Sequence, residues 1–115
     1  MNELKDFWVW VFDGKVEFGM VGDELVVYRR TTFNYADGEW NLSDPVTLTL
    51  DNLFKWAMPK LGGTEVFCDV DFRFNKDYDL NWQVYLATQY KDDLVAGADT
   101  PAQALYLAIQ KVRSQ

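Results

Sequence analysis

The densest group of side chains able to do chemistry is acidic: Asp69, Asp71, Asp77 and Asp79. Asp69 and Asp71 are two residues apart, so they share one face if their segment is a β-strand. Asp77 and Asp79 fall in the polar loop that we expect to follow that strand. Carboxylates this close repel one another unless a metal ion, a basic side chain or a basic partner offsets them.

Three interpretations of this acidic group remain open at the level of sequence. The group is a solvated sheet face whose charge is relieved by Arg73 and Lys76. Alternatively, it is a patch that receives a basic partner. A divalent-metal site is the third interpretation, although the residues do not match a complete octahedral or EF-hand ligand set.

The rest of the sequence excludes most familiar catalytic chemistry. There is no histidine, which removes Ser-His-Asp and Cys-His sites, most zinc sites and the commonest general base. Cys68 is expected on the inward face of a strand as a core thiol, and the serines, Ser43 and Ser114, lie in a proline-containing loop and at the tail. Because nucleotide-binding glycine motifs are also missing, we predict a protein that is not an enzyme and uses no cofactor.

Aromatic residues make up 17% of the chain, with five Trp, six Tyr and eight Phe. A core this small does not take them all, so we expect some rings at the surface. The pattern places Trp8, Trp10 and Trp82 inside. It leaves outside a set that could anchor a protein interface, namely Phe67, Tyr85, Tyr35, Trp40 and Trp56.

Length and charge restrict the class of protein further. The 115 residues, 49% of them hydrophobic, are enough for one domain with its own core. The net charge of −7 argues against direct binding of nucleic acid or of an anionic membrane. It permits a basic partner, and it also simply favours solubility. With a single cysteine, no signal peptide and no long apolar segment, the predicted location is the cytoplasm.

The N-terminal half predicts mainly strands. Residues 7–12 form a continuous β-branched and aromatic run, which indicates a strand. Asp13 and Gly14 then predict a hairpin turn, since both central residues of such a turn need positive φ. Two further strands are expected at 15–21 and 24–33, and residues 31–46 predict a long hairpin with Asp37 and Gly38 at its tip.

The C-terminal half predicts helices around a pair of strands. The first helix is expected to begin after an N-cap at Thr49. Its apolar stripe consists of Leu50, Leu53, Phe54, Ala57, Met58 and Leu61. Pro59 interrupts the regular helix, and Gly62 and Gly63 follow its end. Residues 64–74 and 80–90 alternate as half-buried strands, and residues 91–99 are expected to be a connector. Thr100 and Pro101 then start the last helix.

The predicted element order is therefore βββ(β)–α–ββ–α. Short turns between neighbouring strands favour antiparallel pairing. We expect an α+β fold with an antiparallel sheet of about five to six strands and two helices, in a single domain over residues 1–115.

Two sequence stretches carry a family resemblance. Asn81-Trp-Gln-Val84 and Ala98-Asp-Thr-Pro-Ala-Gln-Ala-Leu105 resemble the C-terminal half of small uncharacterised phage and prophage proteins of the phage sandwich-domain kind. The resemblance covers residues 50–112. It implies an origin in a mobile element and a small accessory protein that acts on host machinery, and it assigns no catalytic or binding residue.

These observations give a first hypothesis and two alternatives. The first is a phage-encoded, acidic inhibitor of a host nucleic-acid-binding defence system, similar to an anti-CRISPR and acting in the host cytoplasm. The acidic group would occupy a basic groove of that host complex while Tyr35, Trp40 or Trp56 anchors the contact. The alternatives are a structural or assembly protein that forms a homodimer, and a metal-dependent hydrolase that uses the acidic group.

Overall fold

The computed structural model describes residues 2–61, 69–77, 82–87 and 92–113; within these ranges the side chains of residues 2, 69, 87 and 92–95 are not described. The chain divides into two compact units, Met1–Thr47 and Leu48–Gln115, and each is treated by itself. The expectation of a single domain stays a prediction. Among the predicted site residues, Phe67 and Asp79 and the side chain of Asp69 lie outside the described part.

The first unit begins with a helix, α1 (Asn2–Val11), so the strand predicted over residues 7–12 is wrong. Phe7, Trp8 and Val11 are buried whereas Val9 is exposed, which is the spacing of one helix face. Asp13 and Gly14 do adopt positive φ, 55° and 79°. They end the helix rather than join two strands, because the Gly14 N–H donates to the Val9 carbonyl at 2.9 Å.

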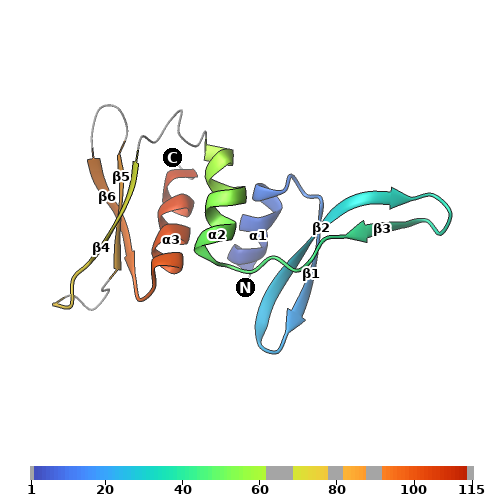
Figure 1. The fold of residues 1–115 in the computed structure, drawn as a ribbon, viewed down its shortest axis with the longest axis horizontal. Helices are drawn as coiled ribbons and strands as arrows, with labels where there is room; N and C mark the ends of the chain where they lie inside the picture. Colours follow the sequence, from blue (N-terminus) through green and yellow to red (C-terminus); the bar gives the residue numbers. More distant parts are fainter. Residues whose placement is uncertain (1, 62–68, 78–81, 88–91, 114–115) are drawn as a thin grey trace. The chain divides into compact units, whose positions relative to one another are not determined.

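Three strands follow in this unit, β1 (Val16–Val21), β2 (Glu24–Asn34) and β3 (Glu39–Leu42), in the antiparallel order β1-β2-β3. The first half of β2 pairs with β1, and the second half continues beyond β1 and pairs with β3. Figure 1 shows this change of partner along β2. The long hairpin predicted over residues 31–46 is therefore confirmed. The buried side chains of the unit are Phe7, Trp8, Val11, Val16, Leu25, Val26, Val27 and Val46.

The second unit opens with a helical segment that changes its winding. It consists of α2 (Leu50–Asn52), the π-helical η1 (Leu53–Ala57) and the 3₁₀-helical η2 (Met58–Leu61). The predicted cap is confirmed, since the Thr49 hydroxyl accepts from the Asn52 N–H at 3.2 Å. Phe54 was predicted on the buried stripe but is exposed. The Met58 N–H bonds to the Leu53 carbonyl, an i→i+5 turn in which the 3.6-residue period no longer applies.

The second sheet contains β4 (Asp69–Phe74), β5 (Trp82–Ala87) and β6 (Asp92–Ala98), antiparallel in the order β4-β5-β6. Strand β6 occupies most of the stretch predicted to be a connector, so that prediction is wrong. Its pairing with β5 includes a bulge, because Val84 faces Ala96 while Tyr85 faces Leu94.

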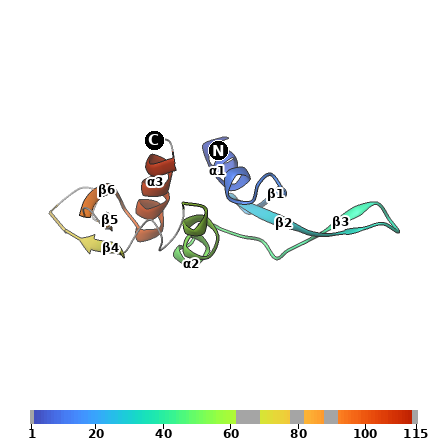
Figure 2. The ribbon, with the colours of Figure 1, turned by 90° about the horizontal axis from the view of Figure 1, so that it is seen from above.

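The last helix, α3 (Pro101–Arg113), begins at the predicted cap, where the Thr100 hydroxyl accepts from the Gln103 N–H at 3.2 Å. It packs on β5 and β6, and both views show it along one face of their sheet (Figure 1, Figure 2). The apolar spacing of this segment predicts a buried stripe of Pro101, Ala104, Leu105, Ala108, Ile109 and Val112. Four of these residues, Ala104, Leu105, Ala108 and Ile109, are buried, whereas Pro101 and Val112 at the two ends are partly exposed. On the sheet, Val84 and Leu86 are buried, so this face of β5 is the covered one.

The predicted fold class is corrected accordingly. In the described ranges the strands form two separate three-stranded sheets rather than one sheet of five to six strands, and the helices are α1, the α2–η2 segment and α3 rather than two. The sheets belong to different units because the helical segment from Leu50 separates their strands in the sequence. No helix among the described residues has the length and hydrophobicity to cross a membrane.

Candidate functional site

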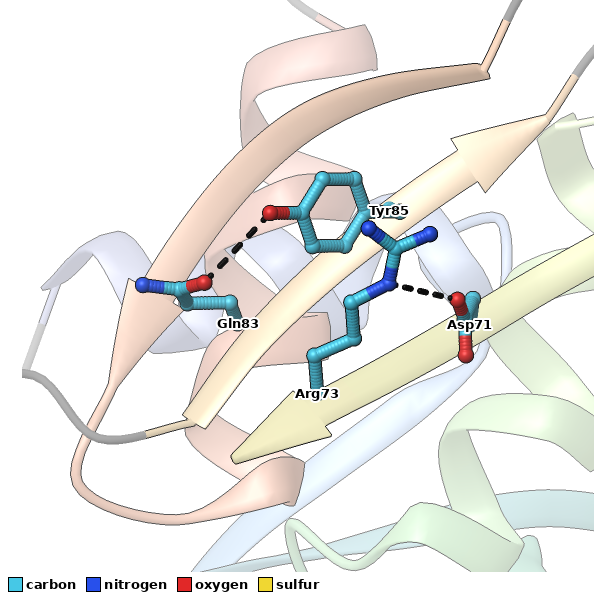
Figure 3. A network of polar contacts seen from close by, with 4 residues as sticks. All are labelled: Asp71, Arg73, Gln83 and Tyr85. Atoms are coloured by element: carbon cyan, nitrogen blue, oxygen red, sulfur yellow. Dashed lines mark hydrogen bonds and ion pairs between the residues drawn. The ribbon is translucent and has the colours of Figure 1, made fainter. Parts of the chain in front are cut away.

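The first candidate surface is the face of β4 and β5 that points away from α3. Side chains alternate between the faces of a strand, so Gln83 and Tyr85 lie opposite to the buried Val84. The register pairs Asp71 with Tyr85 and Arg73 with Gln83. Figure 3 shows these four side chains together on the outer face, and we call them the β4–β5 polar group.

Arg73 connects the members of this group. Its Nε donates to Asp71 Oδ2 at 2.8 Å, and its guanidinium carbon lies 3.8 Å from the centroid of the Tyr85 ring. The Tyr85 hydroxyl donates to Gln83 Oε1 at 3.4 Å. The side chains of Arg73 and Asp71 are 50% and 43% exposed, so their ion pair is a surface pair that contributes little to stability. It does neutralise the charge of Asp71 locally.

The remaining members of the predicted acidic group are only partly described. Asp69 is the first residue of β4, and its side chain lies outside the described part. Asp77 lies beyond the end of β4, in a loop where its N–H donates to Asn75 Oδ1 at 3.0 Å. Over the parts of the chain that the structure describes, no three carboxylate or thiol side chains are grouped in a way that could hold a metal ion.

The metal-dependent hydrolase hypothesis stays a prediction. Calorimetric titration of the protein with Mg²⁺, Mn²⁺ and Ca²⁺ tests it directly. Heat that saturates at one ion per chain would support a carboxylate site, and no heat with any of the three ions would remove the hypothesis.

Two of the predicted aromatic anchors lie beside a cation of their own unit. The Arg73 guanidinium lies over the Tyr85 ring, as described above. Trp56, on η1, is half-buried, and the Lys55 Nζ lies 4.9 Å from the centroid of its ring. These cation–π contacts occupy ring surface that an interface anchor would offer to a partner.

The second candidate surface is the hairpin formed by β2 and β3. Phe33 pairs directly with Trp40 across the strands, with ring centroids 5.2 Å apart, and Tyr35 packs edge-on against Phe33 at 4.9 Å. Tyr35 is 89% exposed and Trp40 is 43% exposed. Leu42, two residues after Trp40, is on the same face and is also exposed. We call Phe33, Tyr35, Trp40 and Leu42 the hairpin face.

Polar contacts on the other side of the hairpin fix its register. Asn41 Nδ2 donates to Thr32 Oγ1 at 2.8 Å. At the tip, Asp37 accepts from Asn34 Nδ2 at 3.1 Å and from the Glu39 N–H at 3.2 Å. These bonds hold the turn in place. Because a slip of one residue would exchange the two faces of the hairpin, they also determine which side carries the aromatic residues.

The structure therefore places the predicted site residues on different surfaces. Tyr35 and Trp40 are together on the hairpin, Asp71 and Tyr85 are together on the second sheet, and Trp56 is on a helical segment. Sequence reasoning missed Phe33 and Leu42 as parts of the hairpin face. The period-2 spacing of Phe33 with Tyr35, and of Trp40 with Leu42, is the signal that could have found them.

Comparison of the chain with models of protein families, with curated proteins and with solved structures finds no match. The resemblance of residues 50–112 to phage and prophage proteins therefore stays a prediction. Function has to be argued from the charges and surfaces of the chain itself.

Proposed function

We propose that the chain is a non-enzymatic, acidic binding protein that docks on a basic surface of a partner protein. The observation that carries this proposal is the exposure of Tyr35 and Trp40, 89% and 43%, in a chain whose net charge is −7. Large rigid rings bury much area at a small entropy cost and are typical interface anchors. An excess of carboxylates accelerates the encounter with a basic partner and disfavours acidic ones.

A narrower form of the proposal is inhibition of a host nucleic-acid-binding defence system, in the manner of an anti-CRISPR. A surface rich in carboxylates resembles a phosphate backbone in charge, so it suits a groove that normally takes nucleic acid. Occupation of that groove would exclude the nucleic acid without any catalysis. The sequence resemblance to phage proteins is the second support for this narrower form.

Affinity purification from a lysate of the source cells, or of the host if the gene is phage-encoded, tests both forms. We expect the chain to retain a basic protein and to release it as the salt concentration rises, because charges at an exposed interface are screened. Retention of no basic protein would contradict the proposal. A retained basic protein that does not bind nucleic acid would contradict only the narrower form.

Variants that neutralise Asp69, Asp71, Asp77 and Asp79 test the part assigned to the acidic group. Replacing all four by Asn keeps side-chain size and hydrogen bonding while removing the charges. If the group enters the basic groove, the retained amount of partner falls strongly. An unchanged amount would show that the partner binds elsewhere on the chain.

A homodimeric assembly protein is the second candidate function. It is favoured by Met20 and Val21 at the end of β1, which are exposed apolar side chains at one end of the first hairpin. Analytical ultracentrifugation over a dilution series separates this candidate from the first. A sedimentation coefficient of a monomer at all concentrations would contradict the dimer.

A further inference from the structure

The anchors predicted from the sequence are not equally available to a partner. The ring of Tyr85 lies 3.8 Å from the Arg73 guanidinium carbon, and the ring of Trp56 lies 4.9 Å from the Lys55 Nζ. The corresponding cation at Trp40, Arg30, is farther away, at 6.0 Å. Tyr35 packs edge-on against Phe33 and leaves 89% of its surface exposed. The hairpin face is thus the aromatic surface best placed to accept an external group.

The charges that follow Arg30 in the first unit are all negative. Between Thr31 and Thr47, where this unit ends, the chain carries Asp37, Glu39 and Asp44 and neither lysine nor arginine. Asp37 is fixed at the tip by its bonds to Asn34 and to the Glu39 N–H. Arg30, at the base, lies 3.8 Å from the Glu17 carboxylate, which offsets its charge. A fixed carboxylate therefore stands at the tip of the hairpin that carries the exposed aromatic rings.

We propose that the hairpin face, with Asp37 at the tip of the same hairpin, is the docking surface of this protein and that its occupant is a lysine- or arginine-bearing segment of a partner protein. This inference rests on the proposed function and adds the surface and the chemistry that it recognises. A guanidinium or ammonium group of that segment can lie on the aromatic rings, and a further basic residue of the segment can pair with the Asp37 carboxylate at the tip.

Charge decides between this occupant and two others. A second copy of the chain would bring Asp37 and Glu39 against another molecule with a net charge of −7, so like charges would oppose the contact. A nucleic acid would bring phosphates to the same carboxylates, while Arg30, the cation beside the Trp40 ring, is already paired with Glu17. A basic protein segment is the occupant that gains from both the rings and the acids.

Site-specific photo-crosslinking in the full-length protein locates the contact. The variant Tyr35→p-benzoyl-phenylalanine probes the hairpin face, and Tyr85→p-benzoyl-phenylalanine probes the β4–β5 polar group as the matched control. Each is produced in the source cells, irradiated and analysed by mass spectrometry. We expect position 35, and not position 85, to crosslink to a peptide in which lysine and arginine outnumber the acidic residues.

The other outcomes separate this inference from the proposed function. Crosslinks to a basic protein from position 85 alone, or equally from both positions, would overturn the hairpin as the docking surface and leave the proposed function standing. Crosslinks from position 35 to a second copy, to nucleic acid or to an acidic peptide would overturn the inferred occupant. Absence of crosslinks from both positions would overturn the inference and the proposed function together.

The affinity of the crosslinked basic segment, made as a synthetic peptide, gives the second measurement. Tyr35→Ala should weaken its binding by about 30-fold, the effect of removing a central aromatic anchor. Leu107→Ala, which removes an exposed apolar side chain from α3, should change the affinity by less than about twofold. Equal effects of the two substitutions would overturn the inference. Tyr35 is so exposed that its removal leaves the fold intact, which circular dichroism verifies.

Discussion

At the scale of single residues, Arg73 changes what the acidic group can do. One interpretation of the acidic group has Arg73 relieve its charge, and Arg73 Nε does lie 2.8 Å from Asp71 Oδ2. Arg73 also covers the Tyr85 ring at 3.8 Å. The sequence places Asp71, Arg73 and Tyr85 on one face by alternation. It does not contain the rotamers that join them, because these depend on the register between β4 and β5.

Gly38 shows how one residue supports the hairpin face. Its φ is 71°, a region that residues with a Cβ adopt at a cost of about 1 kcal/mol, although the space around a Cβ there is open. We therefore expect Gly38→Ala to destabilise the tip by about 1 kcal/mol, while Gly38→Asn has a smaller effect. Hydrogen exchange of the hairpin amides measures this local stability. Equal protection in the wild type and Gly38→Ala would contradict the assigned backbone conformation.

At the scale of elements, local signals were sufficient where an element has its own start and stop residues. Thr49 and Thr100 cap helices as predicted, and the central residues of the apolar stripe of α3 are buried as predicted. The strand prediction for residues 7–12 failed because it began at Phe7 and so left out Leu4. Leu4, Phe7, Trp8 and Val11 have helical spacing, and the last three of these are buried.

Strand β6 was missed because its local preference is weak. Alanine and glycine make up much of its second half and are poor strand formers. The pairing of β6 with β5 and its contact with α3 determine the strand.

The division of the strands into sheets also depends on contacts that the local sequence does not contain. Short turns predict which strands are neighbours, but they do not predict that β1–β3 and β4–β6 form separate sheets. The alternation of residues 64–74 also predicts Phe74 on the inward face, but Phe74 is the last residue of the edge strand β4 and is 57% exposed.

Removal of a core side chain of α3 measures how far the second unit depends on this packing. Leu105 is fully buried between the helix and its neighbours. We expect Leu105→Ala to lower the free energy of unfolding by about 2–5 kcal/mol, since it removes apolar contacts and leaves a cavity. Denaturant titration followed by circular dichroism provides the value. Leu107→Ala, on the exposed side of α3, serves as the control and should change it by less than about 0.5 kcal/mol.

At the scale of the whole molecule, the proposal of a basic partner rests on the net charge of −7 and on the exposed aromatic residues. Residue counts alone predicted the negative net charge and the presence of aromatic rings at the surface. The position of the aromatic residues and of Asp37 on the hairpin could not be predicted in full, since the bonds at Asp37 and the Phe33–Trp40 pair arise from the register of β2 and β3.

The affinity for a basic partner should depend on ionic strength. Raising the salt concentration from about 0.05 M to about 0.5 M shortens the screening length from more than 10 Å to less than 5 Å. We therefore expect the dissociation constant to rise at least tenfold, mainly through a slower association rate. Surface plasmon resonance at several salt concentrations gives both rates. A dissociation constant independent of salt would mean that the carboxylates do not contribute to binding.

Quantitative affinity purification with three forms of the chain tests the central claim most directly. The forms are the wild type, the double variant Tyr35→Ala and Trp40→Ala, and the control Leu107→Ala, all with unchanged circular dichroism. The hairpin should carry the contact, so the double variant loses the basic partner while the control retains it at the wild-type amount. Retention of the same basic partner by the double variant at the wild-type amount would contradict the claim.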